Sequence, residues 1–215
     1  MKAGLKKPSS TKNQARHRRR RLFRFRFMPS HEGKALYKWS KEFSKSGPII
    51  EIGTYCGKST IYLGFGANEN NEVVFTIDHH SGSEEHQLKE EYFDPEVFDV
   101  QENRVNTFPL FLKNIQKYNL DNIIPIVSSS RVAAKSWNTS AGMIFIDGGH
   151  SLESAFNDYN CWTKYVKKNG ALVIHDIYED PGEGGQAPYE IYKEALKNDF
   201  IEYERVDTIV CLKRI

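Results

Sequence analysis

The chain lacks a cysteine framework, a long apolar run and, near its start, any acidic residue. Its 215 residues include only three cysteines, an odd number that does not fit a disulfide-stapled secreted domain. We therefore expect a reducing compartment and a cytoplasmic protein. No stretch approaches the roughly 18 consecutive apolar residues of a transmembrane helix. With 39% hydrophobic residues, the chain is too apolar for wholesale disorder and can bury a core.

Charge is distributed unevenly along the chain. Residues 1–28 hold eleven of the 30 Lys and Arg residues and no acid, the first acid being Glu32. The remaining 19 basic residues face 28 acidic ones, so residues 29–215 carry a net charge of −9. Such a body would repel a phosphate backbone. We expect a basic, disordered tail over 1–28 and a single acidic domain over 29–215.

The basic tail permits several interpretations. An Arg-rich segment without acids is typical of a nucleic-acid arm, an anchor to an anionic membrane or an organelle-targeting presequence. The plainer alternatives are a disordered tail, or sequence upstream of a true start at Met28. The tail has no secretory apolar region, which argues against export.

Helical and strand patterns alternate along the body. The spacing of apolar residues predicts a first helix over 31–44, with Ser30 as its N-cap. It predicts a long helix over 152–166 that stops at 168–170. The other predicted helices cover 59–67, 108–118, 130–137 and 189–198, and the predicted strands cover 49–52, 73–77, 123–127, 143–146, 171–174, 200–206 and 209–213. This alternation predicts a Rossmann-like α/β fold, in which helices cover both faces of a mostly parallel seven-stranded sheet that ends in an antiparallel hairpin.

The ends of four of the predicted strands are marked by polar or ionisable residues or by a glycine. They are Glu51 and Gly53, then Asp78, then Asp147, and finally His175 with Asp176. Because the carboxyl ends of parallel strands share one edge of a sheet, residues far apart in sequence should converge there, where such sheets bind ligands.

The glycine turn after the first strand has two nucleotide interpretations. Gly57-Lys58-Ser59 matches the end of a phosphate-binding P-loop, but the first glycine of G-x-x-x-x-G-K-[ST] would fall on Ile52. The alternative is the E-x-G-x-x-x-G turn of class I S-adenosylmethionine methyltransferases, which this segment resembles. In those enzymes an acid at the end of the second strand, here Asp78, binds the ribose hydroxyls.

Three motifs in order strengthen this resemblance. Residues 52–59 resemble the first motif of the catechol O-methyltransferase group, and 145–150 and 173–176 resemble later motifs of a bacterial family that includes macrocin O-methyltransferase-like and cephalosporin hydroxylase-like proteins. The resemblance covers about 30–215 and implies a methyltransferase domain that binds S-adenosylmethionine. The cofactor-binding residues that it implies or suggests are Glu51, Gly53, Tyr55, Gly57, Ser59, Asp78, His79, Ser128, Ser129 and Asp147.

The resemblance also implies how the reaction proceeds. A divalent cation, Mg²⁺ or Mn²⁺ before Fe²⁺, would bind Asp147 and Asp176, with His175 as a further ligand, and would acidify a hydroxyl of the acceptor. His150 stands where the catechol enzymes carry a lysine base, so it is the candidate general base, beside Asp147 as the second catalytic residue. The run from Asp78 to His86 is dense in histidine and glutamate, and we interpret it as a polar lid rather than a second metal site.

We therefore expect transfer of a methyl group from S-adenosylmethionine to an oxygen of a small molecule. A metal-dependent hydroxylase on the same scaffold and a P-loop NTPase remain the alternatives. Nucleic acid or an anionic membrane would be a partner only through the tail, and a homodimer stays open.

Overall fold

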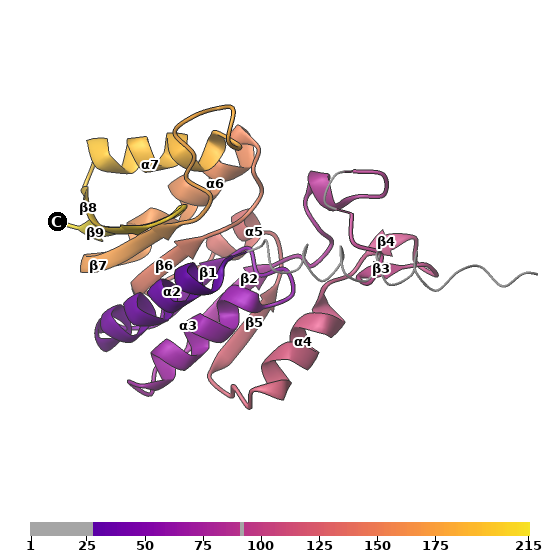
Figure 1. Cartoon of the computed structure of the whole chain (residues 1–215). Helices are drawn as coiled ribbons and strands as arrows, with labels where there is room; N and C mark the ends of the chain where they lie inside the picture. Colours follow the sequence, from indigo (N-terminus) through magenta and orange to yellow (C-terminus); the bar gives the residue numbers. More distant parts are fainter. Residues whose placement is uncertain (1–27, 91–92) are drawn as a thin grey trace, which may run out of the picture.

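The computed structural model describes residues 28–90 and 93–215, and its centre is a seven-stranded sheet (Figure 1). The strands lie in the order β5-β2-β1-β6-β7-β9-β8. Their bounds are β1 Ile49–Ile52, β2 Val74–Asp78, β5 Ile123–Val127, β6 Ala141–Ile146, β7 Val166–Ile174, β8 Phe200–Val206 and β9 Ile209–Arg214. The predictions for the tail concern residues outside the described range, apart from Met28, which is buried in the core.

The sheet is parallel except for one strand. β1 pairs with β2 and β6 in parallel, and β5 and β7 extend this arrangement on the two sides. β9 runs antiparallel to both β7 and β8, and the hairpin that joins β8 to β9 turns at Asp207 and Thr208. The Rossmann-like fold and the terminal hairpin that the sequence predicts are confirmed.

Helices cover both faces of the sheet (Figure 1). The helices α2, α3 and α4 pack on one face and α5, α6 and α7 on the other. They span α2 Ser30–Phe43, α3 Lys58–Asn68, α4 Phe108–Lys117, α5 Ser130–Ala134, α6 Leu152–Trp162 and α7 Ala187–Lys197. Neighbouring residues of a strand enter opposite cores, as Phe145 and Ile146 do, because side chains alternate across a strand. All six residues of β6 are buried, as expected for a central strand covered on both faces.

Three details differ from the prediction. The helix predicted over 152–166 ends at Trp162, a short 3₁₀ turn follows, and β7 already begins at Val166. Asn169 lies inside this strand at φ 62°, so the segment expected to stop a helix instead forms a bulge in the pairing of β7 with β6. Ser30 is the first residue of α2 rather than its cap, and Pro29 occupies the N-cap position.

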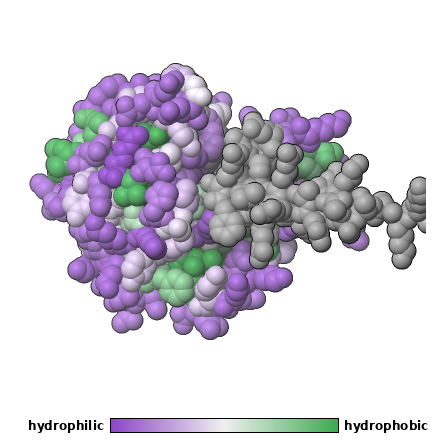
Figure 2. Space-filling model, in the orientation of Figure 1, coloured by the Kyte–Doolittle hydropathy of each residue, from purple (hydrophilic) through white to green (hydrophobic). Residues whose placement is uncertain are grey.

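The segment between β2 and α4 contains structure that the sequence did not predict. β3 (Phe98–Asp99) pairs antiparallel with β4 (Arg104–Val105), and this small hairpin extends away from the main sheet (Figure 1). None of the helices in 28–90 and 93–215 is long and apolar enough to cross a membrane. Figure 2 shows a mainly hydrophilic face on which apolar residues form separate patches.

Candidate active site

The carboxyl ends of four parallel strands meet at one edge of the sheet. Backbone hydrogen bonds continue past the strand ends: Gly53 N donates to Ile77 O at 3.0 Å, and Asp147 N donates to Ile52 O at 2.8 Å. His175 N donates in the same way to the last residue of β6. The polar residues at the carboxyl ends of β1, β2, β6 and β7 are therefore held in a row, as their positions in the sequence predict.

The turn after β1 depends on the absence of two side chains. Gly53 has φ 84°, and a Cβ atom on it would lie 2.1 Å from the carbonyl oxygen of Asp147. Gly57 has φ 82°, and its Cβ would lie 2.8 Å from the Phe111 ring. Both positions combine a left-handed backbone with a close neighbour, which only glycine accommodates. The turn thus lies directly against the segment that carries Asp147.

Asp78 binds the backbone of this turn. Its Oδ2 accepts hydrogen bonds from the N–H groups of Thr54 and Tyr55, both at 2.8 Å. Its Oδ1 accepts from His80 N at 2.7 Å. Asp78 therefore organises two segments at the ligand-binding edge. Its contact with a ribose, which would use the remaining lone pairs, stays a prediction.

Glu51 lies beneath the turn with no accessible surface. Its carboxyl group accepts hydrogen bonds from the hydroxyls of Ser59 and Thr60, the latter at 2.6 Å. Burial raises the pKa of Glu51 to about 8, although these two hydrogen bonds act in the opposite direction. Glu51 and Ser59 support each other here, and their contact with a cofactor stays a prediction.

The remaining cofactor candidates lie around the same turn. Tyr55 has φ 48° and stacks on the ring of His86 with a centroid distance of 5.0 Å. Ser128 N donates to Asp78 O at 3.1 Å, and exposed Ser129 precedes α5. His79 is exposed, and its Nδ1 accepts a hydrogen bond from Ser81 N.

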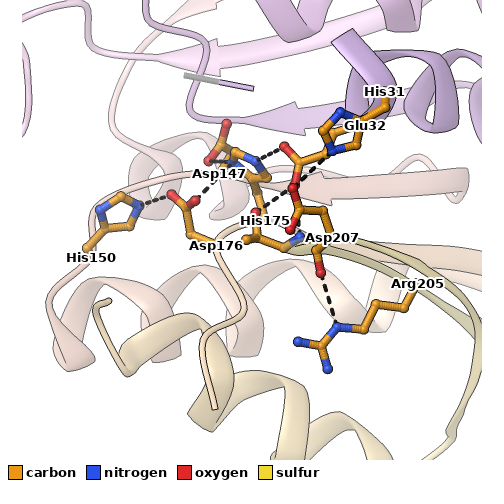
Figure 3. A network of polar contacts seen from close by, with 9 residues as sticks. His31, Glu32, Asp147, His150, His175, Asp176, Arg205 and Asp207 are labelled. Carbon is orange, nitrogen blue, oxygen red and sulfur yellow. Dashed lines mark hydrogen bonds and ion pairs between the residues drawn. The ribbon is translucent and has the colours of Figure 1, made fainter. Parts of the chain in front are cut away.

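A cluster of acids and histidines follows β6 and β7 (Figure 3), and the close approach of Gly53 to the Asp147 backbone places it beside the glycine turn. His175 is 6% exposed, and its Nδ1 lies 3.1 Å from Asp147 Oδ1 and 3.7 Å from Asp176 Oδ1. On the other side of the ring, Nε2 lies 3.0 Å from Oε2 of Glu32, which is fully buried. His150 Nε2 lies 3.3 Å from Asp176 Oδ2.

Mutual electrostatics shift the pKa values in this cluster. Burial by itself would lower the pKa of His175, but the charge of Asp147 and hydrogen bonds to Asp147 and Glu32 raise it well above its usual value. Burial would raise the pKa of Asp176, whereas the hydrogen bond from His150 and the charge of His175 lower it. Burial would also raise the pKa of Glu32, but the hydrogen bonds to its carboxylate and the charge of His175 outweigh this effect and lower it. Without a bound cation, the cluster thus contains three carboxylates around one imidazolium, an excess of negative charge, and a cation bound to Nδ1 would replace the proton there.

Residues 50–177, more than half of the chain, match a family model described as a methyltransferase domain. The chain belongs to this family of class I S-adenosylmethionine-dependent methyltransferases. The P-loop NTPase interpretation is therefore wrong. Its physical flaw is visible in the turn, since the Thr54 and Tyr55 amides bond to Asp78 and the Ser59 hydroxyl bonds to Glu51. These amides and this hydroxyl are therefore already hydrogen-bonded within the protein and are not available to bind a phosphate and its cation.

Proteins similar to this methyltransferase include a sequence relative and several solved structures. An uncharacterised protein of Acanthamoeba polyphaga mimivirus is 33% identical over 70 residues, which cover 32% of this chain and 28% of the viral protein. The O-methyltransferase from Bacillus cereus in complex with SAH has a TM-score of 0.61 at 15% identity, covering 98% of this chain and 93% of that one.

Two further solved structures are described as different kinds of methyltransferase. The O-methyltransferase NovP has a TM-score of 0.63 at 12% identity, covering 85% of this chain and 78% of its own. An rRNA methylase from Streptococcus thermophilus has a TM-score of 0.54 at 10% identity, covering 83% of this chain and 93% of that one. At these identities the likeness shows the fold and leaves the acceptor open.

The residues at the glycine turn fit S-adenosylmethionine. The turn leads into the N-terminus of α3, where backbone N–H groups favour a negatively charged ligand group such as the carboxylate of the methionine moiety. The hydroxyl oxygen of Thr54 is buried in this turn and has no hydrogen-bond partner within the described ranges. A buried polar atom of this kind usually has a partner, and a bound cofactor would supply one.

The acid–histidine cluster fits a divalent cation. Single ligand atoms of Asp147, His175 and Asp176 lie within 4.8 Å of one another. Neighbouring ligand atoms around an octahedral cation with bonds of about 2.1 Å lie about 3 Å apart, close to the 3.1 Å between His175 Nδ1 and Asp147 Oδ1. Oxygen and imidazole donors together suit Mn²⁺ or Fe²⁺ and, less well, Mg²⁺.

Two residues of the site were missed by the sequence analysis. Glu32 falls in the first turn of α2, where acids are common for electrostatic reasons alone, so nothing in the sequence distinguishes it. Asp158 on α6 accepts a hydrogen bond from Ser130, and Gly148 packs against it: a Cβ there would lie 2.5 Å from Asp158 Oδ2. Asp158 thereby supports the segment that carries Asp147 and His150.

Proposed function

We propose that this methyltransferase transfers the methyl group of S-adenosylmethionine to an oxygen of a small-molecule acceptor, with a divalent cation held by Asp147, His175 and Asp176. The observation that carries the proposal is the position of this cluster directly against the glycine turn, through the contact of Gly53 with the carbonyl of Asp147. A methyl donor at the turn and an acceptor at the cluster would be neighbours, as an in-line displacement requires.

The cation would supply Lewis-acid polarisation, which lowers the pKa of an acceptor hydroxyl. His150 would accept the hydroxyl proton on its imidazole, and Asp176, 3.3 Å from His150 Nε2, would orient that ring and stabilise its cationic form. Asp147 and Asp176 are both partly exposed, whereas His175 is buried. The acceptor would therefore approach from the carboxylate side of the cluster.

Three of the ten non-glycine residues with positive φ in the described ranges lie at this edge. Tyr55, His80 and Asp176 all adopt positive φ, at 48°, 57° and 59°. Non-glycine residues in this region cost about 1–3 kcal/mol each and persist where the surroundings enforce them, often at functional sites. All three adjoin the glycine turn or the acid–histidine cluster, which supports a ligand site there.

A screen of methyl acceptors tests the proposal. The full-length protein would be incubated with radiolabelled S-adenosylmethionine and either small hydroxylated aromatics, including catechols, or total RNA. Each assay would be run with Mn²⁺ and with EDTA. We expect label on a small hydroxylated compound, lost with EDTA. Transfer to RNA alone, or full activity in EDTA, would contradict the proposal, and oxygen consumption with Fe²⁺ would favour the hydroxylase alternative.

RNA is the competing acceptor because an rRNA methylase shares the fold and residues 1–28 are strongly basic. The net charge of −9 on residues 29–215 disfavours it.

A further inference from the structure

Glu32 joins three parts of the molecule that are distant in sequence. It lies in the first turn of α2 and is fully buried. Its Oε1 accepts two hydrogen bonds from Thr208, from the backbone N–H at 2.9 Å and from the hydroxyl at 2.7 Å. Its Oε2 faces His175 Nε2 at 3.0 Å. One carboxylate therefore connects α2, the turn between β8 and β9, and the end of β7 (Figure 3).

The two oxygens of Glu32 are not interchangeable. A backbone N–H group is always a donor, so the atom of residue 32 that faces Thr208 N must be an acceptor. A carboxylate then offers a second acceptor to His175, and Nε2 of the imidazole must carry a proton to bond with it. When the ring holds a single proton, that proton is on Nε2, and the lone pair on Nδ1 points toward Asp147 and Asp176.

We propose that Glu32 is a positioning residue that fixes the protonation of His175 on Nε2 and thereby presents Nδ1 as a ligand for the divalent cation. This inference rests on the proposed function, since it concerns the same cation. A second carboxylate behind a metal-binding histidine commonly sets the tautomer and the ring orientation. The next residue, Gly33, lets the start of α2 pack closely against α3, because a Cβ atom at this position would lie 2.3 Å from the Tyr62 ring.

The Glu32→Gln variant tests this directly. The backbone N–H of Thr208 requires the amide oxygen on its side, so the amide NH₂ would face His175 Nε2. Nε2 would then have to accept, which moves the single ring proton to Nδ1 and removes the ligand lone pair. We expect Mn²⁺ affinity, measured by electron paramagnetic resonance, to fall about 10- to 100-fold, whereas affinity for S-adenosylhomocysteine without metal should change less than about twofold.

Thr208→Val is the matched control. It removes the hydroxyl bond to Glu32 and keeps the backbone bond and the contact with His175. If Glu32 merely joined α2 to the hairpin, Glu32→Gln and Thr208→Val would have similar effects on Mn²⁺ affinity. The inference predicts that Thr208→Val lowers thermal stability but leaves Mn²⁺ affinity within about threefold of wild type.

Nitrogen-15 NMR of the metal-free proteins separates this inference from the proposed function. We expect His175 Nε2 to be protonated in the wild type and unprotonated in Glu32→Gln. An Nε2 that stays protonated in a folded Glu32→Gln variant, together with unchanged Mn²⁺ affinity, would overturn the inference. Wild-type protein that binds no Mn²⁺ would instead refute the cation site. If the variant does not fold, the test is made on the wild type by adding Mg²⁺. The inference predicts that the nitrogen-15 chemical shift of His175 Nδ1 changes, and a change at Nε2 instead would contradict it.

Discussion

Gly53 lies against the carbonyl oxygen of Asp147, so closely that a Cβ atom would be 2.1 Å from that oxygen. The contact places the cofactor turn after β1 directly beside the first acid of the cluster after β6. Two motifs that are far apart in sequence thus become neighbours through the lack of one side chain.

The Gly53→Ala variant should destabilise the fold. Alanine at φ 84° incurs the left-handed penalty of about 1–2 kcal/mol, and the overlap with the Asp147 backbone adds about 1–3 kcal/mol. Urea denaturation would measure the loss. Gly185→Ala is the control, because a Cβ there meets no atom within 4 Å and its φ is ordinary. Equal stability of the two variants would refute this account of the turn.

Replacement of Asp78 by asparagine should weaken binding of S-adenosylhomocysteine. The Asp78 carboxylate accepts three backbone hydrogen bonds, and an amide has only one acceptor oxygen, so at least one N–H loses its partner and the turn that would hold the cofactor is no longer fixed in the binding conformation. A loss of about 1–3 kcal/mol, or about 5- to 150-fold in the dissociation constant, should appear in calorimetric titration. Glu102→Gln, at an exposed position, removes the same charge as a control. An unchanged affinity of Asp78→Asn would remove Asp78 from the cofactor site.

His150 should determine the acid limb of the pH–rate profile. Only the neutral imidazole accepts a proton, so methyl transfer should slow as the pH falls and His150 becomes protonated. In His150→Gln we expect a lower rate at every pH and a flattened acid limb, whereas His31→Gln, at a histidine that is 55% exposed and outside the acid–histidine cluster, should keep the wild-type shape. An unshifted profile in His150→Gln would exclude His150 as the base.

Asp158 should make stability depend on pH. Burial raises the pKa of Asp158 from 3.8 to about 6. Because the pKa of Asp158 is higher in the folded state than in the unfolded state, its ionisation does not lower the free energy of unfolding below about pH 4. The loss of stability then grows as the pH rises to 6. Above pH 6 it stays near 2–3 kcal/mol, from about 1.4 kcal/mol per unit.

Asp158→Asn removes this ionisation and can still accept the Ser130 hydrogen bond. We expect the free energy of unfolding of the variant to rise relative to that of the wild type between pH 4 and 6, and the difference to stay constant above pH 6. Urea denaturation across this range measures it. A difference that does not vary with pH would show that Asp158 titrates normally.

The sheet could be predicted because its signals are local. Apolar runs such as 143–146, each followed by a polar residue, identify the strands and also the edge at which a ligand binds. The start of β7 was missed because Lys167, Lys168 and Asn169 read as the exposed end of a helix, whereas Val166 pairs with Ala141 of β6 and these three residues form a bulge before the regular pairing resumes at Ala171. Tertiary pairing of this kind overrides local propensity.

The candidate site was predicted only in part for a similar reason. Asp147, His175 and Asp176 stand directly after strands, so the fold alone brings them together. Glu32 reaches His175 through the packing of α2 on the sheet, and Asp158 reaches Ser130 from another helix. Contacts of this type depend on how helices pack, which the spacing of residues does not encode.

Binding of Mn²⁺ in the presence of S-adenosylhomocysteine tests the central claim most directly. Electron paramagnetic resonance should detect one Mn²⁺ per wild-type chain, and both Asp147→Asn and Asp176→Asn should weaken it at least about tenfold. Asp207→Asn, at a half-exposed acid beside the cluster, should bind as the wild type does. Absence of bound Mn²⁺ in the wild type, or equal binding by all four proteins, would contradict the account.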